Sequence, residues 1–379
     1  MLTLSMVKAD VGGMVGHTSV HPDLFDTARE RLGRAKKQGA LTDFHLLRCG
    51  DDMGILLAHR EGEESGEIHE LAWNTLVACG RVAKGLKLHD AGEDLIGEEF
   101  HGSLTGMGPA VAEIEFTERK SEPVIVYMTD KAASGAWNLP FFKVFADPFN
   151  SSGLVDDPVM ISGFSFRVTD VRDDSHIMLS CPEELHYLLS LIGFTSRYAI
   201  TATHRNSDME QASAASARIP IKRHAGGGGG DDPVALVRCE NGFPSVGEVL
   251  EPFAFPHLVE GWLGGSHTGP LMPVPFYEAN PTRSGGPPRV IAAGFQLSNG
   301  RLLGPHDMFD DPGFDGARRL SGRVGDYMRG HGPFQPHRMP EERMEYGTLP
   351  SVVERLKGRF EREKKKGKGK VHKFKGLYQ

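Results

Sequence analysis

Cysteine is scarce in this 379-residue sequence, and long apolar runs are missing from it. Its four cysteines lie far apart without a Cys-x-x-Cys pair, which argues against a zinc ribbon and is typical of reduced thiols. No apolar stretch approaches the roughly 20 residues that a membrane helix needs, and the first residues do not combine a basic with an apolar region. We therefore expect a cytoplasmic protein with no membrane partner.

Several catalytic motifs are also missing. The sequence contains no Gly-x-Ser-x-Gly and no His-Glu-x-x-His, the signatures of many serine hydrolases and zinc proteases. The run from Gly80 to Lys87 falls one residue short of a P-loop and lies within a helical pattern, so we treat it as a chance match. The glycine run 226–230 leaves two interpretations open: backbone N–H groups that bind a phosphate, or a flexible loop.

Charge is distributed unevenly along the chain. The net charge is −7, yet residues 361–379 carry eight Lys or Arg against two Glu, so the preceding residues are acidic. We expect residues 1–360 to form one domain and residues 361–379 to be a basic, disordered tail. Such a tail can bind nucleic acid, but a solvated extension is the commoner role, and we expect no nucleic-acid partner.

Apolar periodicity predicts a mixed α/β chain without internal repeats. Leu2, Leu4 and Met6 alternate with Thr3, Ser5 and Val7, which indicates a strand that ends at Asp10. Further strands are expected at about 44–49, 53–58, 110–116, 123–129, 163–168, 176–180, 197–203, 234–239 and 289–297. Helices are expected from Pro22 with Phe25, Ala28, Leu32 and Ala35 on one face, at about 67–84, from Pro182 to Gly193, and at about 313–330 and 350–360.

Carboxylates stand where several of these strands begin or end. Asp10 and Asp130 follow apolar runs, and the pairs Asp51-Asp52 and Asp231-Asp232 precede others. Carboxylates that converge need cations to offset their repulsion, and hard oxygen ligands favour Mg²⁺, which in proteins usually handles phosphate. A turn is the alternative role, because Asp-Asp occurs five times here and three of the pairs run directly into Pro.

The order and spacing of the motifs add a resemblance. They include Val7-Lys8-Ala9-Asp10, Gly16-His17, Gly50-Asp51-Asp52, Ala91-Gly92-Glu93-Asp94-Leu95, Asn138-Leu139-Pro140, Gly269-Pro270-Leu271-Met272-Pro273-Val274 and Met344-Glu345-Tyr346. From about residue 4 to about residue 360 the chain resembles the fructose-1,6-bisphosphate aldolase/phosphatase family. The resemblance implies a four-layer α-β-β-α sandwich (α+β), a homo-octamer and a cluster of several Mg²⁺ ions.

The resemblance also implies roles for individual residues. The implied metal ligands are Asp10, His17, Asp51, Asp52, Glu93, Asp130, Asp231 and Asp232, with Glu93 standing where the family usually has Gln. Asp10 matches the base that the family is proposed to use, and Lys131 and Tyr346 match substrate-binding residues. His89 stands at the position of a substrate-binding Tyr, and Glu240 at that of a Gln.

Other positions depart from the family pattern. Gly230 occupies the position of the lysine that forms a Schiff base, and Gly227 that of a catalytic tyrosine. Gly264 and Gly285 replace an arginine and an aspartate of the sugar pocket. Because Schiff-base catalysis requires a positioned primary amine, we expect the aldolase activity to be lost; Lys222 is the nearest lysine.

The sequence therefore predicts a Mg²⁺-dependent phosphatase that hydrolyses a sugar phosphate, with fructose 1,6-bisphosphate the leading candidate by resemblance. Two alternatives stay open. One is a bifunctional aldolase/phosphatase that uses another lysine. The other is a non-catalytic relative that binds metal or phosphate, favoured by the glycines in the pocket and disfavoured by the complete set of metal ligands.

Overall fold

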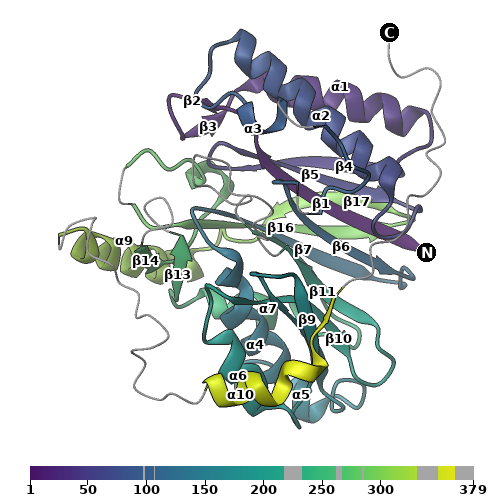
Figure 1. Ribbon diagram of the computed structural model, residues 1–379, viewed down its shortest axis with the longest axis vertical. Coiled ribbons are helices and arrows are strands. Elements are labelled where there is room, and N and C mark those ends of the chain that lie inside the picture. The colour runs from purple at the N-terminus through teal and green to yellow at the C-terminus, as the bar shows by residue number, and fades with distance from the viewer. Residues whose placement is uncertain are drawn as a thin grey trace.

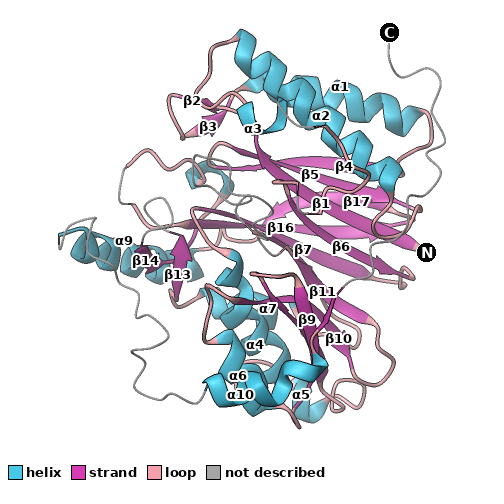
Figure 2. Cartoon of the chain, in the orientation of Figure 1, coloured by secondary structure: helices cyan, strands magenta, loops and turns pink. Residues whose placement is uncertain are grey.

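The computed structural model describes residues 1–96, 99–105, 107–216, 233–261, 267–283, 286–330 and 349–362. Within these ranges two antiparallel layers of strands lie between two layers of helices (Figures 1 and 2). The first sheet has the order β4 (Asp43–Cys49), β5 (Asp52–His59), β1 (Leu2–Asp10) and β6 (Ala110–Phe116). Every neighbouring pair in it is antiparallel.

The second sheet is larger and holds ten strands. Its order is β15 (Met272–Pro273), β16 (Arg289–Ser298), β7 (Glu122–Asp130), β12 (Val234–Arg238), β11 (Gln211–Ala215), β10 (Tyr198–Arg205), β8 (Phe164–Asp170), β9 (Ser175–Cys181) and β18 (Glu361–Arg362). β17 (Arg301–Asp307) also pairs with β16, across the turn at Asn299-Gly300. All pairs are antiparallel except β15 with β16, which is parallel.

Side-chain alternation explains why the two sheets stack. On β1, Leu4 and Met6 belong to the core between the sheets, whereas Val7 and Ala9 belong to the core under the first helix layer. β7 repeats this in the second sheet, with Val126 facing the inter-sheet core. Because successive residues of a strand point to opposite faces, even-numbered residues of both strands point into the space between the sheets.

Amphipathic helices cover the two outer faces. α1 (Pro22–Lys37) and α2 (Gly66–Gly85) pack on the first sheet (Figure 1). α4 (Asn138–Ala146), α6 (Leu185–Ile192), α7 (Val246–Leu250) and α10 (Leu349–Leu356) contribute to the core on the outer face of the second sheet. The predicted four-layer sandwich is confirmed.

Further elements complete the described part of the chain. They are β2 (Gly13–Met14), β3 (Ser19–Val20), α3 (Glu93–Ile96), η1 (Ser134–Trp137), α5 (Gly153–Asp156), η2 (Glu251–Phe253), β13 (Leu258–Gly261), β14 (His267–Pro270), η3 (Phe276–Glu278), η4 (Pro312–Phe314), α9 (Asp315–Gly330) and η6 (Lys357–Arg359).

Local details differ from the predictions. The helix expected from Pro182 begins at Leu185, and α4 and β11 were not predicted. On α1 the buried residues include Leu24, while Phe25 is only partly buried. Glu361–Arg362, the first two residues of the expected disordered tail (361–379), instead pair with β9, while residues 363–379 lie outside the described part. Each helix in the described ranges is too short or too polar to cross a lipid bilayer.

Candidate metal centre

Three of the predicted carboxylates meet at one end of the two sheets. Asp10 is the last residue of β1 and pairs with Asp52, the first residue of β5. Asp130 ends β7 in the other sheet. Asp10 and Asp130 occupy even positions of their strands, and Asp52 lies on the same face of the sheet as its paired residue Asp10. All three side chains therefore lie on the side of their sheet that faces the other sheet. Strand parity therefore brings together carboxylates that are far apart in the sequence.

A tight turn brings the two sheets into contact at this point. Gly50 and Asp51 link β4 to β5, and Gly50 has a φ of +64°, which glycine adopts without steric cost. A Cβ atom at residue 50 would lie 2.9 Å from Cγ of Asp130. Only a residue without a side chain lets Asp130 approach the turn that carries Asp51 this closely.

The loop after β1 adds an imidazole. His17 Nδ1 lies 3.0 Å from Asp51 Oδ2, and the Gly12 N–H donates to Asp10 Oδ1 at 2.8 Å. One ligand atom from each of Asp10, His17 and Asp51 lies within 4.8 Å of the others. This is the spacing of side chains that can share one cation.

Burial and charge shape the electrostatics. Asp51, Asp52 and Asp130 are 5%, 6% and 4% exposed. Burial, and next the neighbouring Asp51 carboxylate, raise the pKa of Asp10 to about 6. Lys8, which is fully buried, places its Nζ 2.5 Å from Asp52 Oδ2 and offsets one negative charge.

A second lysine lies at the edge of the group. Lys131 directly follows Asp130, has a φ of +63° and places its Nζ 3.8 Å from Asp130 Oδ2. Its side chain is one-third exposed (33%). Among the described residues, four carboxylates and one imidazole lie beside a single fully buried amine, and this is the donor set of a divalent-cation site.

Some predicted residues lie nearby or outside the described part. Backbone hydrogen bonds tie His89 to Gly13, the first residue of β2 in the segment that follows β1. Glu93 begins α3, but the structure does not describe its side chain. The remaining predicted positions fall outside the described residues: Asp231, Asp232 and Tyr346, together with Lys222, Gly227, Gly230, Gly264 and Gly285.

Glu240 is not brought to this group. β12 runs antiparallel to β7, so that Arg238 pairs with Val124 and Cys239 donates to Pro123. Glu240 thus lies at the far end of β7 from Asp130, about 25 Å away at the usual rise per residue. There its Oε1 accepts from the Val246 N–H at the start of α7.

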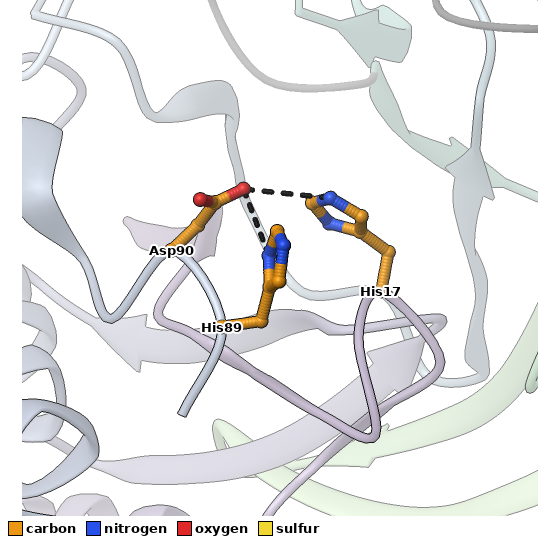
Figure 3. Close-up of side chains that lie close together, drawn as sticks. All are labelled: His17, His89 and Asp90. Carbon is orange, nitrogen blue, oxygen red and sulfur yellow. Dashed lines mark ion pairs between the residues drawn. The ribbon is translucent and has the colours of Figure 1, made fainter. Parts of the chain in front are cut away.

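Two residues near the centre were not predicted. Lys8 stands at an even, inward-facing position of a buried strand, where a charged residue needs a partner of opposite charge. A lysine within an apolar strand pattern could therefore have indicated its pairing with a carboxylate of the centre. Asp90 gave no such signal. Its Oδ2 lies 3.4 Å from His17 Nε2 and 3.1 Å from His89 Nδ1 (Figure 3).

The fold and the site define a class: a four-layer α+β sandwich in which strand ends and the adjoining turns carry a cluster of carboxylates suited to metal binding. Residues 1–361 match the family model described as fructose-1,6-bisphosphatase. The chain is 50% identical over 359 residues to a fructose-1,6-bisphosphate aldolase/phosphatase of Methanothermobacter marburgensis, covering 95% of this chain and 98% of the relative.

Other relatives carry the same name. Identity is 51% over 360 residues to the protein of Ignicoccus hospitalis, covering 94% of this chain and 92% of the relative. It is 51% over 362 residues to that of Moorella thermoacetica, covering 95% and 94%. The chain belongs to the fructose-1,6-bisphosphatase family.

Proposed function

We propose that this protein is a Mg²⁺-dependent phosphatase that hydrolyses fructose 1,6-bisphosphate to fructose 6-phosphate and phosphate. The observation that carries the proposal is the convergence of Asp10, Asp51, Asp52 and Asp130 with His17 at one end of the sandwich. Relatives about half identical over nearly their whole length bear the aldolase/phosphatase name.

The donor set supports magnesium as the cation. Carboxylate oxygens are the ligands that Mg²⁺ prefers, and the residues that would hold it are Asp10, His17, Asp51, Asp52 and Asp130, with Glu93, Asp231 and Asp232 added from the sequence. Bound Mg²⁺ supplies charge neutralisation of phosphate oxygens and lowers the pKa of water.

Asp10 is the proposed general base. Burial and the neighbouring Asp51 carboxylate raise the pKa of Asp10, which makes it a better proton acceptor than an exposed aspartate. The proton would come from the water whose oxygen attacks phosphorus as the phosphorus–oxygen bond to the sugar breaks, and the leaving sugar oxygen would take up a proton from solvent. The Gly12 N–H fixes Oδ1 of Asp10, which leaves Oδ2 for that proton.

Cationic and polar groups would hold the substrate. The exposed part of Lys131 offers an ammonium group to a phosphate beside Asp130. His89, beside the loop after β1, and Tyr346 are proposed to contact the sugar phosphate.

A homo-octamer is part of the proposal and is tested by light scattering on a size-exclusion column.

Phosphate release tests the function. The purified protein is incubated with fructose 1,6-bisphosphate and MgCl₂, with and without excess EDTA, and phosphate is measured. We expect activity that needs the cation and falls at least 100-fold in Asp51→Asn. The matched control is Asp156→Asn, which changes an exposed aspartate of α5 and should keep full activity.

Two results would contradict the proposal. Undiminished turnover in EDTA would remove the cation requirement, and full activity of Asp51→Asn would remove the carboxylate cluster from the mechanism. A screen of other sugar phosphates under the same conditions tests the substrate separately, because Gly264 and Gly285 alter the predicted sugar pocket.

A further inference from the structure

A second group of candidate ligands lies beside the proposed magnesium centre. It consists of His17, His89 and Asp90, each contributing one ligand atom within 4.8 Å of the others (Figure 3). The distances from Asp90 Oδ2 are 3.1 Å to His89 Nδ1 and 3.4 Å to His17 Nε2. Ligand atoms around a tetrahedral Zn²⁺ ion are about 3.3 Å apart, since zinc–ligand bonds are about 2.0–2.1 Å long.

The backbone holds these ligands in place. His89 exchanges two backbone hydrogen bonds with Gly13, at 2.9 and 3.0 Å, in the loop that carries His17. Asp90 has a left-handed φ of +49°, a conformation that aspartate tolerates better than most residues. The three side chains are 53%, 49% and 58% exposed, so that water can complete a coordination sphere.

His17 has its two ring nitrogens directed at different groups. Nδ1 lies against Asp51 Oδ2, and Nε2 faces Asp90 and His89. With the Nδ1 proton donated to Asp51, the lone pair is on Nε2. This is the carboxylate–histidine–metal arrangement that orients metal-binding imidazoles. Neutral imidazole has one lone pair, so His17 binds a cation through Nε2 or through Nδ1, but not through both.

We propose that His17, His89 and Asp90 form a site for a transition-metal cation of the Zn²⁺ class, distinct from the magnesium centre. Two imidazoles and a carboxylate favour Zn²⁺ over Mg²⁺, which prefers oxygen ligands. Occupation of this site removes His17 from the magnesium cluster. Zn²⁺ therefore inhibits the phosphatase; this second half rests on the proposed function.

Metal titration tests the site without reference to activity. Protein freed of metal with EDTA and dialysed is titrated with Co²⁺, whose visible absorption reports tetrahedral coordination, and the bound Co²⁺ is then displaced with Zn²⁺. The variants are His89→Ala and Asp90→Ala. The matched control is His186→Ala, an exposed histidine on α6 that belongs to no ligand group among the described residues.

We expect one tetrahedral Co²⁺ per chain in the unaltered protein and in His186→Ala, with affinity at least 10-fold weaker in both site variants. Equal titrations in all four proteins would overturn the site. In the phosphate-release assay with Mg²⁺, Asp90→Ala should need at least 10-fold more Zn²⁺ for half inhibition. Unchanged inhibition would overturn the competition for His17. A protein without phosphatase activity contradicts the proposed function alone, because the titration still decides the site.

Discussion

The Nζ of Lys8 lies 2.5 Å from Oδ2 of Asp52, and the two side chains are 0% and 8% exposed. A buried ion pair adds little net stability over an apolar pair, but removal of one partner leaves a buried charge uncompensated. Lys8 thus makes it possible to keep a carboxylate at the inner end of β5.

Lys8→Met should destabilise the protein when no divalent cation is present. The expected loss is about 3–5 kcal/mol of unfolding free energy, because Asp52 keeps its charge without the ammonium group. Thermal unfolding in EDTA measures it. Lys84→Met, at an exposed position of α2, is the control. Equal melting temperatures for the two variants would show that Lys8 does not stabilise the carboxylate.

Gly50→Ala should abolish phosphate release. The added Cβ would meet Asp130 Cγ at 2.9 Å and would also require an unfavourable φ of +64°. Gly39→Ala separates the two effects, since Gly39 has a φ of +83° but nothing within 4 Å of an added Cβ. We expect both variants to lose about 1 kcal/mol of stability from backbone strain, and only Gly50→Ala to lose activity more than 10-fold. Similar activity losses in both would contradict the contact with Asp130.

The contribution of His59 to stability should be lost as the pH is lowered from about 6.5 to about 4. His59 is buried beside Ser5, with Nε2 2.7 Å from the Ser5 hydroxyl, and burial lowers its pKa to about 4. In the unfolded chain His59 has an ordinary pKa near 6.5 and binds a proton at pH values where it stays neutral in the folded chain. Burial acts to raise the pKa of Glu113, but the interactions of this carboxylate, led by the hydrogen bond with His69, together outweigh burial and the pKa is lowered. The stability that this carboxylate contributes is therefore also lost as the pH falls, at a lower pH than for His59.

Chemical denaturation at several pH values measures this dependence. His59→Gln keeps a polar group of similar size but cannot titrate. In this variant the difference in unfolding free energy between neutral pH and pH 4 should be smaller by up to about 3 kcal/mol. His186→Gln, at the exposed position on α6, serves as the control. A pH profile of His59→Gln that matches the unaltered protein would rule out His59 as the source.

No Schiff base should form with dihydroxyacetone phosphate. Gly230 and Gly227 offer neither the amine nor the proton-transfer group at the positions where the family carries them. The protein is incubated with dihydroxyacetone phosphate and reduced with borohydride, and its intact mass is measured by mass spectrometry. The aldolase/phosphatase of Methanothermobacter marburgensis is the comparison protein. An adduct on any lysine of this chain, Lys222 included, would support the bifunctional alternative instead.

Local pattern accounts for most of the predicted elements. The alternation of Leu4 and Met6 with Val7 identifies β1 because a period of two is a property of the strand itself. Pro22 marks the start of α1 for an equally local reason. α4 was not predicted, because its apolar residues (Phe141, Val144 and Phe145 among them) serve a buried helix and show no clear polar face.

The candidate site divides in the same way. The sequence by itself determined that Asp10 and Asp130 follow strand-like runs and that the pair Asp51-Asp52 precedes one. Only the tertiary structure decided that Gly50 meets Asp130, that Asp90 meets His17, and that Glu240 lies at the far end of β7. Those relationships join different layers and loops, and the stacking of layers depends on the whole core, which no local period encodes.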